Sequence, residues 1–209
     1  LGLGNLIQGV PLDQEGNFIG SFSLFFRPYP ILIGLFTTTL FIMHGSIYLA
    51  MKTEGVLHER LRIWVKLSIF LFVIIYFITT FSTWMFMPHM VERIQEYRWL
   101  SLVPVAALLA ILNVPRLFSL KKDFQAFLFS CLGIILMLVV FGIGTFPNLV
   151  RSLVQPDLLS LNFLNASGSE LNLTVLLIIV AIGLPFVFCY SAMIYRVFRG
   201  KVKIEASSY

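Results

Sequence analysis

The stretch IFLFVIIYFITTFSTWMFM, residues 69–87, decides the fold class. It holds no acidic or basic residue, and its apolar residues follow one another without the period-two alternation that marks a barrel strand. Only helices and closed barrels pair all their backbone polar groups inside lipid. A helix needs about 20 apolar residues to cross the hydrocarbon core. The stretch therefore predicts a transmembrane helix, which we place over 63–87.

Four further apolar runs have the character of membrane spans. They lie at 31–51, 99–114, 124–146 and 171–195. The run 99–114 rises only ~24 Å as a helix, and it reaches across a ~30 Å hydrocarbon core only if it runs on through Pro115 to Phe118. The sequence thus predicts an all-α fold, a polytopic membrane helical bundle of five transmembrane helices within 31–199.

The composition of the chain agrees with lipid as its solvent. Hydrophobic residues make up 58% and charged residues 12% of the 209 residues. Soluble domains carry about 25% charged residues, so this chain has too little polar surface to cover a globule in water. Cys131 and Cys189 both fall inside apolar runs without CxxC or Cys/His spacing. They predict thiols that pack or face lipid, not a disulfide or a metal site.

Basic residues predict the orientation of the chain. The formal net charge is +5, and because the basic residues stand at the ends of the apolar runs, they indicate topology instead of a nucleic-acid partner. Four of the fifteen fall on one side: Arg27, Arg93, Arg98 and Arg151. Eleven fall on the other: Lys52, Arg60, Arg62, Lys66, Arg116, Lys121, Lys122, Arg196, Arg199, Lys201 and Lys203. The positive-inside rule then predicts 1–30 as an external loop segment and 200–209 as a cytoplasmic tail.

His44 is the one ionisable residue placed well inside a predicted span. It shares a helical stripe with Thr37 and Tyr48, so this helix is expected to face the interior of the bundle. Two interpretations of His44 stay open: a neutral ring hydrogen-bonded to a neighbouring helix, or a proton-path or quinone contact. Next to the stripe lies a small-residue face where a helix can approach closely. Its members are Gly34, Thr38 and Gly45.

Other polar residues near the spans favour packing. Tyr76, Thr80 and Thr83 share a face of 63–87, and hydroxyls at that spacing usually bond across helices or to the carbonyl four residues back. Met87 and His89 are residue types that ligate haem, but their nearness in sequence is weak support for a haem site. We expect His58 and His89 in loops. The sequence holds no HExxH, CxxCH, P-loop or GxGxxG motif, and we assign no catalytic or metal-binding residue.

Several short stretches, in this order along the chain, resemble subunit II of cytochrome bd ubiquinol oxidase. They cover nearly its whole length and fall on alternating sides of the five spans. They are Gly9-Val10-Pro11-Leu12-Asp13, Arg27-Pro28-Tyr29, His44-Gly45-Ser46, Tyr48-Leu49, Lys52-Thr53-Glu54-Gly55, Glu59-Arg60, Asn165-Ala166-Ser167-Gly168-Ser169, Leu184-Pro185, Tyr190, Tyr195 and Phe198-Arg199-Gly200-Lys201.

The resemblance implies a subunit of nine helices in two four-helix bundles and a peripheral helix, of which this chain looks like the C-terminal five. Because the chain opens at Leu1 without a signal-peptide pattern, we expect it to be a piece of a longer protein. The family implies a complex of the cell (inner) membrane that oxidises ubiquinol or menaquinol and reduces dioxygen to water.

Cofactors and partners follow from the same resemblance. It implies that haem b and haem d are bound by the partner, the haem-binding subunit I, and that this chain binds no haem. Small accessory membrane subunits, membrane lipids and a quinone or lipid lodged in the bundle are further expected partners. The alternatives are a transporter or channel fragment, which would need charged residues along its spans, and a membrane enzyme with its own site.

Overall fold

The structure is a computed structural model that describes residues 1–198 and 200. It consists almost wholly of helices, with one two-stranded antiparallel sheet. In chain order the elements are α1 (Gly2–Gln8), η1 (Phe22–Phe26), α2 (Pro28–Lys52), α3 (Gly55–Phe86), α4 (His89–Glu96), η2 (Arg98–Ser101), α5 (Leu102–Ser119), α6 (Asp123–Thr145), β1 (Asn148–Val150), α7 (Pro156–Leu159), β2 (Leu161–Asn162) and α8 (Glu170–Val197).

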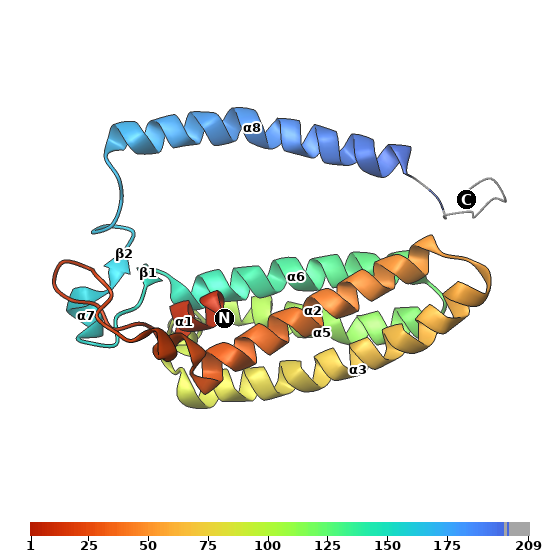
Figure 1. Ribbon diagram of the computed structural model, residues 1–209, viewed down its shortest axis with the longest axis horizontal. Coiled ribbons are helices and arrows are strands. Elements are labelled where there is room, and N and C mark those ends of the chain that lie inside the picture. Colours follow the sequence, from red (N-terminus) through yellow and green to blue (C-terminus); the bar gives the residue numbers. More distant parts are fainter. Residues whose placement is uncertain (199, 201–209) are drawn as a thin grey trace.

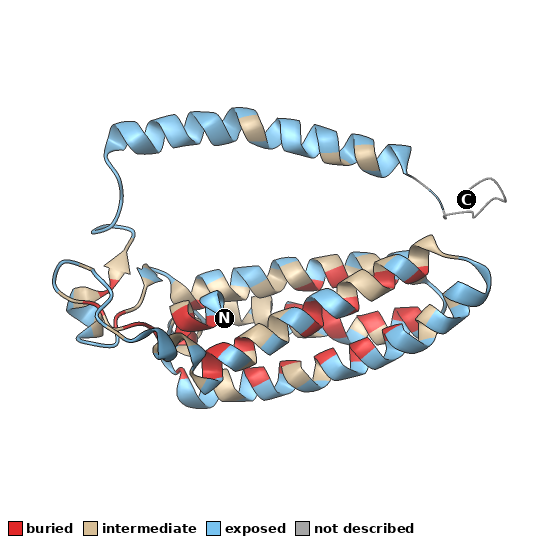
Figure 2. Ribbon diagram, in the orientation of Figure 1, coloured by how far each residue is buried: buried red, intermediate tan, exposed pale blue. Residues whose placement is uncertain are grey.

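Helices α2, α3, α5 and α6 form a four-helix bundle around one apolar core (Figure 1). Short turns join α2 to α3 and α5 to α6 and make each of these pairs antiparallel, as is usual in such bundles. The most deeply buried large side chains of the core are Met43, Ile47, Phe72, Ile111 and Phe118. Outside this core the helix surfaces are exposed and mostly apolar, as lipid-facing or partner-facing surfaces are (Figure 2).

Among the described residues, five helices are long and apolar enough to cross a membrane, which confirms the predicted polytopic all-α fold. Their bounds differ from the sequence estimate most at α3, which begins at Gly55 and not near residue 63. Its first two turns mix apolar residues with His58, Glu59, Arg60 and Arg62, so hydropathy does not reveal them, although they continue the helix beyond the apolar stretch. His58, expected in a loop, therefore lies on α3. Gly55 adopts φ 63°, and this left-handed conformation favours glycine at the tight turn from α2.

One end of the bundle, here named the capped end, is covered by α1, α4 and the segment after α6. Residues 1–30, expected as a loop, contain α1 and η1 and are held by side-chain hydrogen bonds. Asn5 Nδ2 donates to Phe25 O at 2.9 Å, and Arg27 donates to Leu24 O at 2.9 Å and to Gly9 O. Burial lowers the pKa of Arg27 from its ordinary value. These bonds give the segment order that its glycine-rich sequence does not predict.

The opposite end, here named the basic end, holds the turns between α2 and α3 and between α5 and α6. Helix α8 runs beside the bundle but apart from it, and none of its residues is buried (Figures 1 and 2). Lys52 Nζ donates to Phe198 O at 2.7 Å and to Gly200 O at 3.1 Å, which ties the end of α8 to the end of α2. Of the predicted tail 200–209, all but residue 200 lies outside the described residues.

Candidate functional site

His44 is half-buried on α2 and faces α6. Its Nδ1 lies 2.8 Å from Ser130 Oγ, and its ring stacks on Phe127 with the centroids 4.9 Å apart. The Ser130 hydroxyl already donates its proton to Phe127 O at 2.7 Å. It must therefore accept from His44, so Nδ1 carries the proton and Nε2 keeps a lone pair. The helix stripe predicted the inward face of His44, and the structure adds the residues it meets.

The other two residues of the predicted stripe, Thr37 and Tyr48, make contacts within the protein. The Thr37 hydroxyl donates to Ile33 O within its own helix, and the Tyr48 ring lies against Phe127, with the centroids 5.6 Å apart. The expected small-residue face is covered only in part. Leu1 lies over Gly34, whereas no atom comes within 4 Å of where a Cβ on Gly45 would stand. Close helix approach at Gly45 is thus not made by the described residues.

The hydroxyls on α3 include one that serves packing, as predicted. Tyr29 on α2 and Thr83 on α3 lie 2.8 Å apart at their oxygens. Thr83 also donates to Thr79 O at 2.8 Å, so Tyr29 is the donor between the two helices. Thr83 therefore makes both the cross-helix bond and the bond four residues back.

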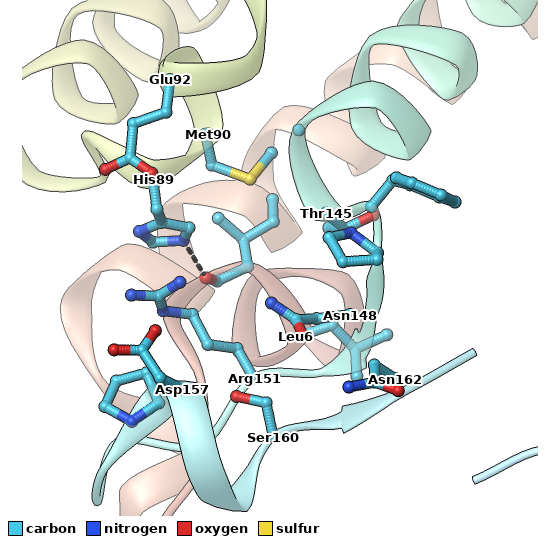
Figure 3. A pocket seen from close by; sticks show the side chains of 15 residues that line it. Leu6, His89, Met90, Glu92, Thr145, Asn148, Arg151, Asp157, Ser160 and Asn162 are labelled. Carbon is cyan, nitrogen blue, oxygen red and sulfur yellow. Dashed lines mark hydrogen bonds between the residues drawn. The ribbon is translucent and has the colours of Figure 1, made fainter. Parts of the chain in front are cut away.

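A polar pocket of about 340 Å³ opens at the capped end. It is lined by side chains from α1, α4 and the segment after α6. Its charged and ionisable members are His89, Glu92, Arg151 and Asp157, and in Figure 3 the Arg151 guanidinium extends toward the His89 ring and the Asp157 carboxyl group. Within residues 1–198, Arg151 forms no ion pair. This polar pocket gathers opposite charges that have no direct partner.

His89 was expected in a loop, but it is the first residue of α4. Its Nε2 donates to Ile7 O at 2.9 Å, because a carbonyl can only accept (Figure 3). Burial lowers the pKa of His89 from its ordinary value, and Arg151 lowers it further, while the bond to Ile7 and the charge of Glu92 raise it. The imidazole is thus held neutral near pH 7 as a structural donor between α4 and α1.

The lowered pKa of His89 predicts acid sensitivity of the capped end. The unfolded chain takes up this proton near pH ~6.5, before the folded chain does, so stability is full above that pH and falls as pH drops below it. His89→Gln keeps a donor for Ile7 O but cannot titrate. We expect the midpoint of thermal unfolding to fall more steeply between about pH 6.5 and 5 in the natural chain than in the variant. Parallel curves for the two would contradict this account.

The sequence could not reveal this polar pocket, because distant backbone pairing assembles it. Val10 N donates to Arg151 O at 2.9 Å, and Leu153 N donates to Val10 O at 3.0 Å. Strands β1 and β2 then fold the segment after α6 back on itself. The only signal in the sequence was a basic and an acidic residue, Arg151 and Asp157, close together between two spans.

Within the described residues, the side chains that could ligate a haem do not stand together. The three histidines lie in separate regions, and each has a ring nitrogen hydrogen-bonded within the protein. Met87, weighed as a ligand with His89, is buried in a small apolar cluster with Ile7 and Tyr29. His89 lines the polar pocket, but its Nε2 is bonded to Ile7 O, and Met87 does not line that pocket. Over residues 1–198 and 200, no cluster of His, Cys, Asp and Glu is suited to a metal ion.

Comparisons with known proteins agree with the fold. The model of the family "Cytochrome bd terminal oxidase subunit II" matches residues 1–198. Cytochrome bd-I ubiquinol oxidase subunit 2 of Escherichia coli (strain K12) is 25% identical, with 97% of this chain and 61% of the relative covered. Cytochrome bd ubiquinol oxidase subunit 2 of Bacillus subtilis (strain 168) is 28% identical, with 94% and 57% covered.

The matches cover nearly all of this chain but only part of each relative. It spans about three fifths of the length of the curated relatives it matches. The family match nevertheless runs through the four-helix bundle, the polar pocket and α8. The resemblance seen in the sequence is therefore confirmed, and this multi-pass membrane chain belongs to the cytochrome bd terminal oxidase subunit II family.

Proposed function

We propose that this chain acts as the non-haem subunit of a cytochrome bd-type oxidase, in which a partner subunit binds haem b and haem d. The complex would oxidise ubiquinol or menaquinol and reduce dioxygen to water in the cell (inner) membrane. The observation that carries the proposal is the family match over residues 1–198. The structure supports a role in which this chain binds no haem itself, because packed side chains fill the bundle interior around His44.

The exposed apolar surface supports a partner within the membrane. None of the 28 residues of α8 is buried, although the helix is apolar around its whole circumference. A partner's haems need a dry surrounding of low dielectric, because hydrogen bonding and solvent access set their potentials. Apolar helices that pack on the partner would supply such a wall.

For orientation, we propose that the capped end is external and the basic end cytoplasmic. The basic end carries most of the lysines and arginines, including Lys52 and Lys122. Single cysteines introduced at Glu92 and at Arg60 would test this. A membrane-impermeant thiol reagent added to intact cells should label the first and not the second, and the reverse pattern would overturn the orientation.

The oxidase proposal is tested by purifying the complex through a tag on this chain. Visible absorption should show haem Soret bands and a d-type band, and both should be lost when the partner's gene is deleted. Quinol-dependent oxygen consumption should follow the same pattern. A colourless protein that moves a solute across liposomes would instead support the transporter alternative.

His44 has a packing role in this proposal, with proton transfer or quinone contact as the alternative. His44→Ala and Ser130→Ala each remove one partner of the same hydrogen bond, so each should cost about 1–2 kcal/mol of stability, and the two costs should not add. Turnover per haem in the assembled complex should stay unchanged. A drop of about tenfold or more in turnover for His44→Ala, with normal haem content, would favour the proton-path role.

A further inference from the structure

A second hollow lies next to the polar pocket. It is an apolar groove of about 550 Å³ between η2 and α6, lined by Trp99, Leu100, Val139 and Ile143. Phe146, at the end of α6, lines both the groove and the polar pocket. The capped end therefore presents a polar hollow and an apolar hollow that share one residue, which is the arrangement an amphiphile requires.

The apolar groove has the position and lining of an acyl-chain site. Tyr97 and Trp99 at its rim are the residue types that gather at the membrane–water interface. Gly142 lies in its lining, and no atom comes within 4 Å of where a Cβ would stand there. Glycine at this point keeps the groove open. A flexible hydrocarbon chain fits such an open apolar surface beside a membrane span.

The polar pocket has charges suited to a zwitterion. Arg151 offers a cation, and Glu92 and Asp157 offer carboxylates, none of them held in an ion pair within residues 1–198. His89 keeps its Nε2 proton on Ile7, so its contribution is to hold α4 in place. Near the shared residue, the Arg93 guanidinium stacks 4.3 Å from the Phe146 ring centroid and donates to Phe146 O at 3.1 Å. A phosphate between guanidinium groups, with an ammonium group near the carboxylates, matches this pattern.

We propose that this combined site binds phosphatidylethanolamine from the membrane leaflet at the capped end. The phosphate lies against Arg151, the ammonium group faces Glu92 and Asp157, and one acyl chain follows the apolar groove past Phe146. An anionic lipid fits less well, because the two carboxylates repel its head. A lipid with a quaternary ammonium group cannot donate hydrogen bonds to them.

The test uses the complex purified through a tag on this chain, washed free of loosely bound lipid and re-exposed to vesicles of phosphatidylethanolamine, phosphatidylglycerol or phosphatidylcholine. Bound lipid is counted by mass spectrometry, so the readout does not depend on oxidase activity. We expect phosphatidylethanolamine to be retained about tenfold more than the other two. Equal retention of the three lipids would overturn the proposal, whatever the oxidase assay shows.

Variants separate the head site from the chain site. Arg151→Gln should lower retention about tenfold, whereas Arg98→Gln removes an exposed cation near the same end and should change nothing. Asp157→Lys should reverse the preference toward phosphatidylglycerol. Gly142→Leu should fill the groove and lower retention, while Gly45→Leu makes the same change on α2, where a Cβ also meets no atom, and should leave it unchanged.

Two outcomes would reject the site even if the complex is intact. One is the same lipid retention in Arg151→Gln as in Arg98→Gln, both with normal unfolding midpoints. The other is a small membrane subunit that leaves with Gly142→Leu while the retained lipid stays constant, because the groove would then hold a helix.

Discussion

Ending the chain after Ser167, which removes α8, is expected to leave the four-helix bundle folded and to lower the haem that co-purifies with it by more than about tenfold. The core formed by α2, α3, α5 and α6 takes no buried residue from α8. The turn held by Asn165, which donates to Ser160 O at 2.9 Å, is retained. In the proposed complex α8 packs against a partner within the membrane, so its loss should lower assembly without unfolding the bundle.

The measurement compares haem per chain in tag-purified complexes with the unfolding midpoint of the same samples. A matched control ends the chain after Gly200, which retains α8 and both carbonyls that Lys52 binds. That control should keep its haem. Full haem content without α8 would argue against a partner contact through this helix. A large fall of the unfolding midpoint in the shortened chain would show instead that α8 stabilises the bundle directly.

The sequence predicted the features that the solvent dictates. Lipid demands long apolar helices, so five spans could be counted from hydropathy, and the inward face of His44 followed from helical periodicity. The partner of His44 did not, because Ser130 is 86 residues away and periodicity identifies a face without identifying its neighbour. Hydropathy also did not predict the first turns of α3, because helical backbone hydrogen bonds continue there although the residues are no longer mostly apolar.

The polar pocket is the feature that the sequence pattern was least able to predict. His89, Arg151 and Asp157 come together because Val10 pairs with the strand-like segment around Ser152. Such pairing between two irregular segments leaves no periodic signal, and the short strands carry no alternation that could be recognised. From the sequence, the charged residues between spans could be used only to predict orientation. Which of them lie close together became visible only in the folded structure.

The second large effect concerns Arg62, which joins three helices at the basic end. Its Nη1 lies 3.0 Å from Asp123 Oδ1 on α6, and its Nη2 donates to Phe118 O on α5 at 2.7 Å. The guanidinium also stacks on the Phe118 ring, 4.3 Å from its centroid. The Arg62 and Asp123 side chains are each only 18% exposed, so removing one leaves the other poorly solvated. Arg62→Leu should therefore destabilise the bundle by about 2–4 kcal/mol.

Reversible unfolding in mixed micelles of SDS and a mild detergent measures this loss. Arg60→Leu is the matched control, because it deletes the same charge from the same turn at an exposed position and should change stability by less than about 0.5 kcal/mol. It also removes one basic residue from the orientation signal, so topology effects appear in both variants and cancel. Adding Asp123→Asn to Arg62→Leu should cost less than the sum of the two single changes, because the carboxylate has already lost its contact with the Arg62 guanidinium. Equal effects at positions 60 and 62 would show that charge near the membrane, and not the Arg62 contacts, holds these helix ends together.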